Sequence, residues 1–334
     1  MTQGPSTTSP AAAAAPPSPV APRSAAWPLI RRVLVTGLRM GLTVLGLLIA
    51  LFFLVRLSGD PAAVLAGPTA TPDQIAAMRE SLGLDDPLFN QFLLYLGDVA
   101  RLDFGRSLFT DQPALSAVMQ RLPATLVLTA STLAVTILVG VPTGLLMARG
   151  RRSVRSLAGG VVSVGLSVPA YILGVLLIWL VAVRWGWLPA YGSGSLRQLI
   201  LPTITLAGLA AARTALLVGS ELERVDDQPF LLTAAAKGAS PRRILWRHAL
   251  PNAMPAVVTM LVVEVSYLVS GAVVVEVLYA YSGIGKQLVD AIFARDYPLV
   301  QATVFVIGVL VVVVNILGDL LLARLDPRAE RETA

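Results

Sequence analysis

Apolar residues are gathered into six long runs along this chain, separated by shorter polar segments. A helix needs roughly 20 apolar residues to cross a bilayer, and each run is long enough. The runs cover residues 33–55, 124–148, 157–183, 199–219, 253–278 and 300–322. The pattern therefore predicts an all-α membrane protein with six transmembrane helices.

Basic residues cluster beside particular ends of these runs and predict the orientation of the chain. Arginines precede the first run or lie near its start, fill the short loop after the second and follow the sixth: Arg31, Arg32, Arg39, Arg149, Arg151, Arg152, Arg155, Arg324 and Arg328. Short loops rich in Lys and Arg stay in the cytoplasm. We therefore expect both termini and the even-numbered loops to be cytoplasmic.

Composition narrows the chemistry available to the chain. Of its 334 residues, 55% are hydrophobic and only 14% are charged, so the net charge of +6 indicates membrane topology rather than nucleic-acid binding. The absence of cysteine excludes disulfides, thiolate metal sites and cysteine nucleophiles. With His248 as the only histidine, a histidine metal site or a Ser/His/Asp triad is not expected.

The first 26 residues consist almost entirely of Ala, Pro, Ser and Thr. Such a segment buries too little apolar area to offset its ordering entropy, so residues 1–26 are predicted to be a disordered cytoplasmic tail. A cleaved signal peptide is the alternative, but the apolar run that follows is longer than the hydrophobic region of a typical signal. Residues 27–55 are therefore assigned to the first transmembrane helix.

Residues 56–123 form a long external segment with more acidic than basic residues. Thr71-Pro72-Asp73-Gln74 has the pattern of a capping box, and Gly83 stands where a helix should end. A second helix is expected after Asp86-Pro87, with apolar residues at helical spacing. This external helical segment could pack on the spans as a lid or serve as a docking surface.

The stretch TAAAKGASPRRILWRHALPN, residues 233–252, is a basic interruption between two apolar runs. Its local signals predict two short helices: Gly238 permits a left-handed stop, and Ser240-Pro241 supplies an N-cap and a proline at the first helical position. Pro251 is expected to block the continuation of the second helix.

Gly238 and the later His248-Ala249-Leu250-Pro251 resemble the "EAA" loop of ABC importer permeases. In that family the loop docks on a cytoplasmic ATPase, so the resemblance implies a coupling role for the matching residues. They are Thr233, Ala234, Ala236, Lys237, Gly238, Ser240, Arg242, Arg243, His248, Leu250 and Pro251. Leu232 stands at the position of the family's glutamate, and His248 replaces the usual isoleucine.

Further segments resemble the B-type permease of dipeptide, oligopeptide and nickel importers. They begin with SGDPAAVLAG at Ser58, LGLDDPLFNQFLLYLGDVARLDFGRSL at Leu82, LPTITLA at Leu201, GAVVVEVLYAYSGIGKQLVDAIFARDYPLVQ at Gly271 and NILGDLLLARLDPR at Asn315. The resemblance implies a type I ABC importer permease fold in the bacterial cytoplasmic membrane. The remaining chain then divides into a five-helix permease core (124–323), containing a cytoplasmic coupling loop (220–252), and a C-terminal cytoplasmic tail (324–334).

Charged residues and prolines inside the runs are candidates for the translocation path. Glu264 lies well inside the fifth run, where an unpaired carboxylate costs a few kcal/mol. It is predicted either to contact a cationic group of the cargo or to pair with another polar group. Asp319 is a second path candidate, Arg213 is expected near the inner surface or a subunit interface, and Pro169 is either a hinge or a packing feature.

The resemblance also implies partners: a C-type permease subunit, one or two ABC ATPases, an extracytoplasmic substrate-binding protein and the surrounding membrane lipid, with no nucleic acid. The chain is expected to bind no cofactor and to hydrolyse no ATP itself, because it has no GxxxxGK[ST] phosphate loop. A dipeptide or oligopeptide is the expected cargo, with nickel or another small solute as the alternative.

Two other classes remain as alternatives. A secondary transporter would show paired intramembrane charges and an inverted repeat, and no such repeat is evident in the sequence. An intramembrane hydrolase would need a nucleophile and a base in the spans. Glu264 and Ser266 are two residues apart and largely on opposed helix faces, and the sequence places no histidine in any span.

Overall fold

The computed structural model describes residues 37–325, apart from 39–40, 54–60, 68 and 82. Throughout this part the regular structure is helical, without a strand. The predicted N-terminal tail and nearly all of the predicted C-terminal tail lie outside the described residues. The all-α prediction is therefore confirmed for the part of the chain that can be described.

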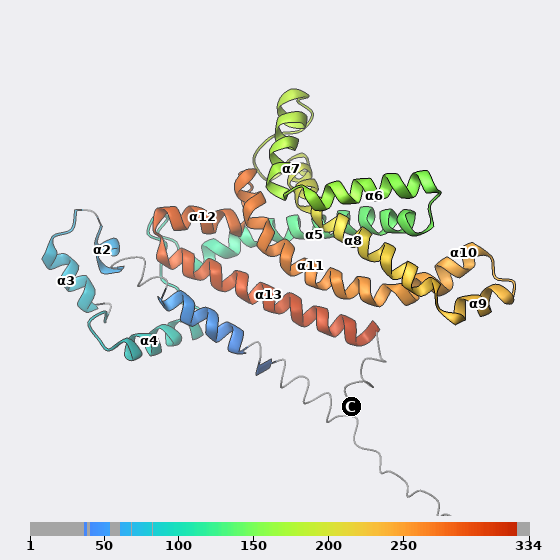
Figure 1. The fold of residues 1–334 in the computed structure, drawn as a ribbon. Coiled ribbons are helices and arrows are strands. Elements are labelled where there is room, and N and C mark those ends of the chain that lie inside the picture. Colours follow the sequence, from blue (N-terminus) through green and yellow to red (C-terminus); the bar gives the residue numbers. More distant parts are fainter. Residues whose placement is uncertain (1–36, 39–40, 54–60, 68, 82, 326–334) are drawn as a thin grey trace, which may run out of the picture.

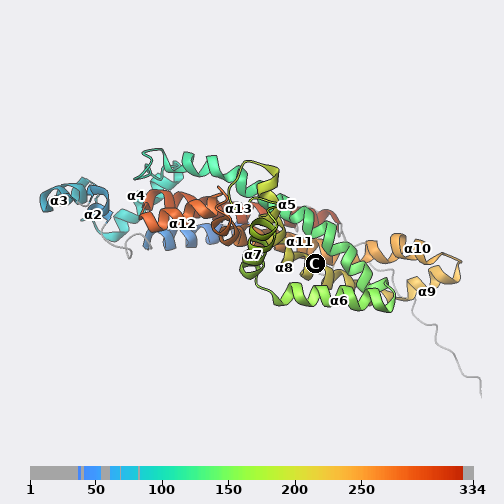
Figure 2. The ribbon, with the colours of Figure 1, turned by 90° about the horizontal axis from the view of Figure 1, so that it is seen from above.

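Four long helices run along the body of the molecule (Figure 1): α5 (Ala114–Arg149), α8 (Leu196–Asp226), α11 (Leu250–Leu278) and α13 (Tyr297–Leu325). One end carries α2 (Pro61–Ala66), α3 (Pro72–Ser81), α4 (Leu88–Ala100) and α12 (Ile284–Ala294). The opposite end carries α9 (Pro229–Ala236) and α10 (Pro241–Ile244), as Figure 2 also shows. The long helices thus connect two ends that carry different short helices.

The local signals of the external segment are confirmed. The Thr71 backbone N–H donates to the Gln74 side chain at 2.9 Å, and the Gln74 N–H donates to the Thr71 hydroxyl at 3.4 Å, which completes the capping box. Gly83 has a φ of +61°, the left-handed conformation expected after α3. Here short-range sequence patterns determine the local backbone.

The six-span count is only partly tested. Among the described residues, the helices long and apolar enough to cross a membrane are α5, α8, α13 and the continuous run Pro241–Leu278, and a bent pair would make a fifth. The part of the first predicted span that is described, Gly41–Phe53, is a shorter apolar helix. Six spans therefore remain a prediction, whereas four of the described helices, or five with the bent pair, have the length and composition of membrane spans.

The third predicted span is not straight. It is divided into α6 (Arg152–Ser167) and a second arm, formed by α7 (Ala170–Leu177) and the π-helical segment η1 (Ile178–Arg184). The two arms are bent by 103°. Val168 is extended, with φ −92° and ψ 116°, because a residue before proline avoids the helical region. Pro169 is therefore the site of a break.

The prediction that Pro251 stops the second coupling helix is wrong. The chain continues from α10 through the π-helical segment η2 (Leu245–Ala249) into α11. Pro251 occupies the first turn of α11, where a missing N–H is tolerated. The wider π turn directly before it changes the hydrogen-bond register, so the helix passes the proline.

The most extensive helix packing joins α5 to α8. The buried face of α5 carries small residues at intervals of three or four: Thr125, Thr129, Thr132, Thr136, Gly140, Gly144 and Ala148. A Cβ atom at Gly144 would lie 2.6 Å from the Ala215 carbonyl oxygen and from the Val218 Cβ. Small side chains therefore let these two helices approach closely, as is common in membranes.

Candidate functional site

The loop between α8 and α11 has a defined backbone. Gly238 has a φ of +80°, and its N–H donates to the Ala235 carbonyl at 2.9 Å. The Ala239 N–H donates to the Ala234 carbonyl at 3.1 Å. These two bonds form a Schellman motif, and the left-handed position within it favours glycine. The predicted stop at Gly238 is confirmed.

The second short helix starts as its sequence predicts. The Ser240 hydroxyl accepts the Arg243 backbone N–H at 3.4 Å, and Pro241 occupies the first helical position. Because α10 continues through η2 into α11, the loop is an extension of a long helix on one side. On its other side, α9 follows α8 after a short turn.

Apolar contacts join this loop to the body of the molecule. Leu231 in α9 and Ala249 in η2 are buried in one cluster with residues near the end of α8 and the start of α11: Val218, Leu222, Val225, Ala253 and Val257. A displacement of α9 would therefore act on α8 and α11 together, since a packed core transmits strain.

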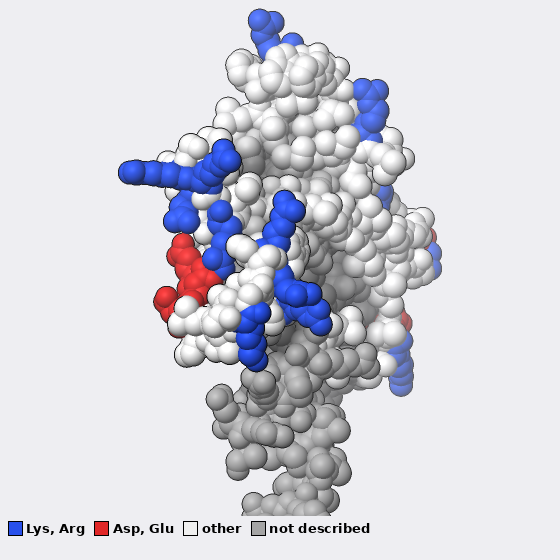
Figure 3. Space-filling model, turned by 90° about the vertical axis from the view of Figure 1, so that its right-hand side faces the viewer, with Lys and Arg blue, Asp and Glu red and all other residues white. Residues whose placement is uncertain are grey.

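Most of the predicted coupling residues lie on the outer surface of the loop. The exposed ones are Thr233, Ala236, Lys237, Gly238, Ser240, Arg242, Arg243 and Pro251, whereas Ala234, His248 and Leu250 are partly buried. Figure 3 looks onto this end of the molecule, where basic side chains outnumber acidic ones. The arrangement suits an acidic or polar partner surface, and the role of each residue remains a prediction.

The same loop also exposes large apolar side chains that were not predicted as contact residues from the sequence. Leu232 is 72% exposed and Trp246 is 62% exposed, and Phe230 is also exposed. Central contacts of protein interfaces are enriched in aromatic side chains. The available signal was a tryptophan and a phenylalanine within an otherwise basic loop.

The arginines of the loop between α5 and α6 serve local structure. Arg149 forms an ion pair with Asp226 at the end of α8. Arg155 donates to the Ala148 carbonyl at 3.0 Å and so satisfies the last turn of α5. Arg151 and Arg152 are exposed.

The intramembrane carboxylate of Glu264 has a partner. Glu264 lies midway along α11, and the side chain is 6% exposed. Its Oε1 is 3.8 Å from Nη1 of Arg213 on α8, and the Arg213 side chain is 41% exposed. A polar partner for Glu264 was one of the two alternatives drawn from the sequence, but a single sequence gives no signal that identifies Arg213 as that partner.

The other two candidates for the translocation path are Pro169 and Asp319. Pro169 lies at the break between α6 and α7, so the expected bend is present. Asp319 lies on α13, and its side chain is outside the described residues.

A buried carboxylate also fixes the turn between α11 and α12. Glu276 is fully buried and accepts hydrogen bonds from the Thr125 hydroxyl at 2.6 Å and from the backbone N–H groups of Gly285 and Lys286 at 2.7 and 3.0 Å. A carboxylate is stabilised at the N-terminus of a helix by the helix dipole. Glu276 therefore caps α12 and connects it to α5.

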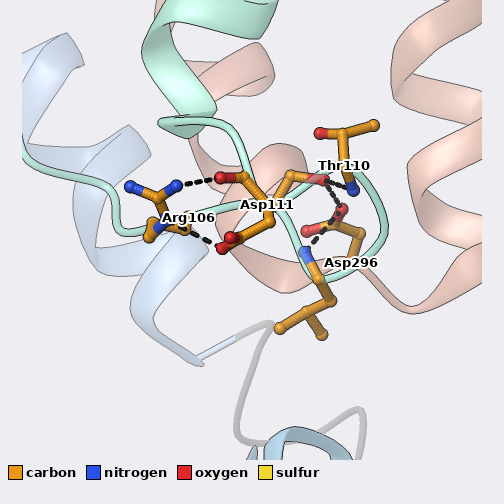
Figure 4. Close-up of polar contacts among 6 residues, drawn as sticks. Arg106, Thr110, Asp111 and Asp296 are labelled. Atoms are coloured by element: carbon orange, nitrogen blue, oxygen red, sulfur yellow. Dashed lines mark hydrogen bonds and ion pairs between the residues drawn. The ribbon is translucent and has the colours of Figure 1, made fainter.

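Asp296 does the same for α13, because its carboxylate accepts from the Leu299 N–H at 3.3 Å. The carboxylate also accepts from the Ser107 hydroxyl at 2.5 Å and from the Leu108 N–H at 3.2 Å, in the loop before α5 (Figure 4). In the same loop, a hydrogen bond from Arg106 and its positive charge hold the pKa of Asp111 below the ordinary value. Glu276 thus lies at the turn between α11 and α12, and Asp296 at the turn between α12 and α13.

Two family profiles match the chain. Residues 140–331 match the binding-protein-dependent transport system inner membrane component, and residues 28–129 match the N-terminal component of binding-protein-dependent transport system membrane proteins. Among known relatives, the "Probable peptide ABC transporter permease protein y4tP" of Sinorhizobium fredii is 40% identical, over 84% of this chain and 93% of that protein. The glutathione transport system permease protein GsiC of Escherichia coli is 35% identical, over 90% of this chain and 97% of that protein.

Solved structures agree with this fold. A chain of the inward-facing MetNI methionine ABC transporter superposes with a TM-score of 0.54 at 22% identity, covering 63% of this chain and 96% of that chain. An amino acid ABC transporter chain gives 0.52 at 16% identity, with coverage of 63% and 94%. These likenesses support the fold of an ABC importer permease. The chain belongs to the family of binding-protein-dependent transport system inner membrane components, and it is a multi-pass permease subunit of an ABC transporter.

Proposed function

We propose that this chain forms half of the translocation pathway of an ABC importer and that α9 and α10 receive a partner ATPase. The observation that carries the proposal is the exposed loop around Gly238, which is attached through Leu231 and Ala249 to two long apolar helices. Closure of the ATPases would move α9, and the packed cluster would transmit that movement along α8 and α11.

The complete importer in this proposal has several partners. A C-type permease subunit supplies the other half of the pathway, one or two ABC ATPases supply the energy, and an extracytoplasmic binding protein delivers the cargo. Membrane lipid surrounds the spans, and nucleic acid has no role. ATP is bound and hydrolysed by the ATPase subunits, and this chain binds no cofactor itself.

The proposed cargo is a dipeptide or an oligopeptide. Two relatives support this choice, because y4tP is named as a peptide permease and GsiC as a permease for glutathione, which is itself a small peptide. The same machinery carrying nickel or another small solute is the alternative. Identifying the solute that the binding protein delivers would decide between a peptide and nickel or another small solute.

The proposed orientation places both termini and α9–α10 in the cytoplasm, with α2–α4 and α12 outside. It is supported by the arginines at the α5–α6 turn, because Arg149 there pairs with Asp226 at the end of α8, next to the coupling loop, and basic residues mark cytoplasmic loops in bacterial membrane proteins.

Co-purification tests the assembly. The protein is extracted from its native membrane in mild detergent, and its companions are identified by mass spectrometry. We expect an ABC ATPase and a second permease subunit. If the protein is recovered alone and transports in vesicles without ATP, the proposal fails and a secondary transporter becomes the better explanation.

A further inference from the structure

Arg213 and Glu264 place a charged pair in the middle of two long apolar helices. Glu264 lies midway along α11, and Arg213 lies in the central part of α8. Intramembrane charges of this kind are costly, and they usually face a protein interior or a water-filled cavity. The location of the pair therefore calls for a function.

The two side chains are exposed to different extents. The Glu264 side chain is 6% exposed, whereas the Arg213 side chain is 41% exposed. The 3.8 Å between Nη1 and Oε1 is an ion-pair distance and is too long for a hydrogen bond. A guanidinium has five N–H donors, so Arg213 retains donors on its exposed side.

An aromatic ring stands next to these free donors. The Tyr267 ring centroid is 5.9 Å from Cζ of Arg213, and Tyr267 is 61% exposed. Leu216 on α8 and Val263 on α11 are also exposed on their helices. The cation and the ring thus belong to an accessible face shared by α8 and α11.

Lipid is a poor occupant for this face, because a guanidinium exposed to hydrocarbon at mid-span pays a large desolvation cost. A water-filled path between this chain and a second permease subunit would avoid that cost. In such a path, Arg213 presents a cation to the cargo. When the path is empty, the buried carboxylate of Glu264 balances the positive charge of Arg213.

We propose that Arg213 binds a carboxylate of the cargo during passage, that Glu264 positions the guanidinium, and that Tyr267 packs beside the bound group. The planar guanidinium matches a carboxylate in a bidentate geometry. The inference rests on the proposed importer function and specifies its substrate class as peptides with a free C-terminal carboxylate. It also reverses the polarity of one of the two alternatives drawn from the sequence, in which Glu264 itself contacts a cationic group of the cargo.

The test uses the complete importer with its binding protein, reconstituted in vesicles with ATP. Uptake of trialanine is compared with uptake of trialanine amide. For each peptide, the uptake rate of a variant is divided by the uptake rate of the unmodified complex. For Arg213→Gln we expect uptake of trialanine to fall about tenfold, because a charge-assisted contact is lost, and uptake of the amide to change by less than about twofold.

Two further variants sharpen the comparison. Arg213→Lys keeps the positive charge but loses the bidentate geometry of the guanidinium, so it should retain part of the preference for trialanine. Arg151→Gln removes an exposed charge from the turn between α5 and α6, outside the coupling loop, and should leave uptake of both peptides unchanged.

Equal loss of both peptides in an assembled Arg213→Gln complex would assign the pair a structural role and overturn the inference, while leaving the importer function intact. Unchanged uptake of both would overturn it too. If the unmodified complex takes up neither peptide, the peptide cargo itself is wrong. If Arg213→Gln does not assemble, the double variant Arg213→Glu/Glu264→Arg can replace it, because this exchange keeps the ion pair. Full uptake of trialanine by the double variant would contradict the proposal.

Discussion

Glu276 shows how a single carboxylate can hold three helices in place. Its oxygens accept from Thr125 on α5 and from the first N–H groups of α12, while the residue itself belongs to α11. The flanking glycines are required, because a Cβ atom at Gly285 would lie 2.6 Å from the Val273 Cα and 2.9 Å from the carboxylate. The sequence SGIGK, which superficially resembles a nucleotide loop, is explained by this cap.

The first prediction concerns this cap. Glu276→Ala leaves a buried hydroxyl and two helix N–H groups without their acceptor, so we expect a loss of about 3 kcal/mol in the free energy of unfolding and a clearly lower melting temperature in detergent. The exposed Glu223, changed in the same way, serves as the control. Equal melting temperatures for the two variants would show that the cap contributes little.

At the scale of elements, α9 illustrates which features of the loop are local. Its end is specified by Gly238 and the following Ser240-Pro241, and the structure contains both the Schellman motif and the serine cap. The continuation of the second helix past Pro251 was not predictable in the same way. It depends on a π turn and on the burial of Ala249 and Ala253 against α8, which are tertiary contacts.

The second prediction tests this loop. Gly238→Pro is incompatible with a φ of +80° and removes the N–H that bonds to Ala235, so we expect recovery of the partner ATPase with the permease to fall about tenfold or more. The spans should remain folded, because they are stabilised elsewhere.

Arg151→Gln provides the control for this loop. Arg151 is exposed in the neighbouring loop between α5 and α6, and its replacement should leave ATPase recovery unchanged. A similar loss in both variants would count against the coupling assignment of the loop around Gly238.

The third prediction concerns the contact of α5 with α8. Gly144→Ala would place a methyl group against the Ala215 carbonyl and Val218, so we expect destabilisation of about 1–3 kcal/mol, seen as a lower melting temperature in detergent. Gly160→Ala on α6 is the matched control, since no atom lies within 4 Å of its Cβ position. There alanine should be neutral or stabilise by up to about 1 kcal/mol.

At the scale of the whole molecule, the two ends carry different elements. The basic loop of α9 and α10 occupies one end (Figures 1 and 3), and α2–α4 and α12 lie toward the other (Figure 1). The long helices between them carry the pair of Arg213 and Glu264 near their middle. This order suits a subunit that receives energy at one end and admits cargo at the other.

The fourth prediction tests the orientation. Because the chain has no cysteine, single cysteines can be introduced at the exposed positions Asp85 and Asp227. A membrane-impermeant maleimide should label Asp85→Cys in intact spheroplasts and Asp227→Cys only after permeabilisation. The reverse pattern would invert the proposed topology.

The sequence by itself determined the features that depend on neighbours along the chain. Apolar runs predicted the spans, arginines predicted an orientation, and Thr71-Gln74, Gly83 and Gly238 predicted caps and stops that the structure contains. These signals are readable because each acts through a backbone segment of a few residues.

Only the tertiary structure decided which distant residues meet. The pairing of Arg213 with Glu264 and the hydrogen bond from Thr125 to the buried Glu276 join segments far apart in the chain. Pro169 indicated a possible bend, whereas the 103° angle between the two arms comes from the fold. A proline in a span shows that a backbone hydrogen bond is lost, and a carboxylate in a span shows that a polar partner is needed. Only the fold shows where the helix bends and which residue is the partner.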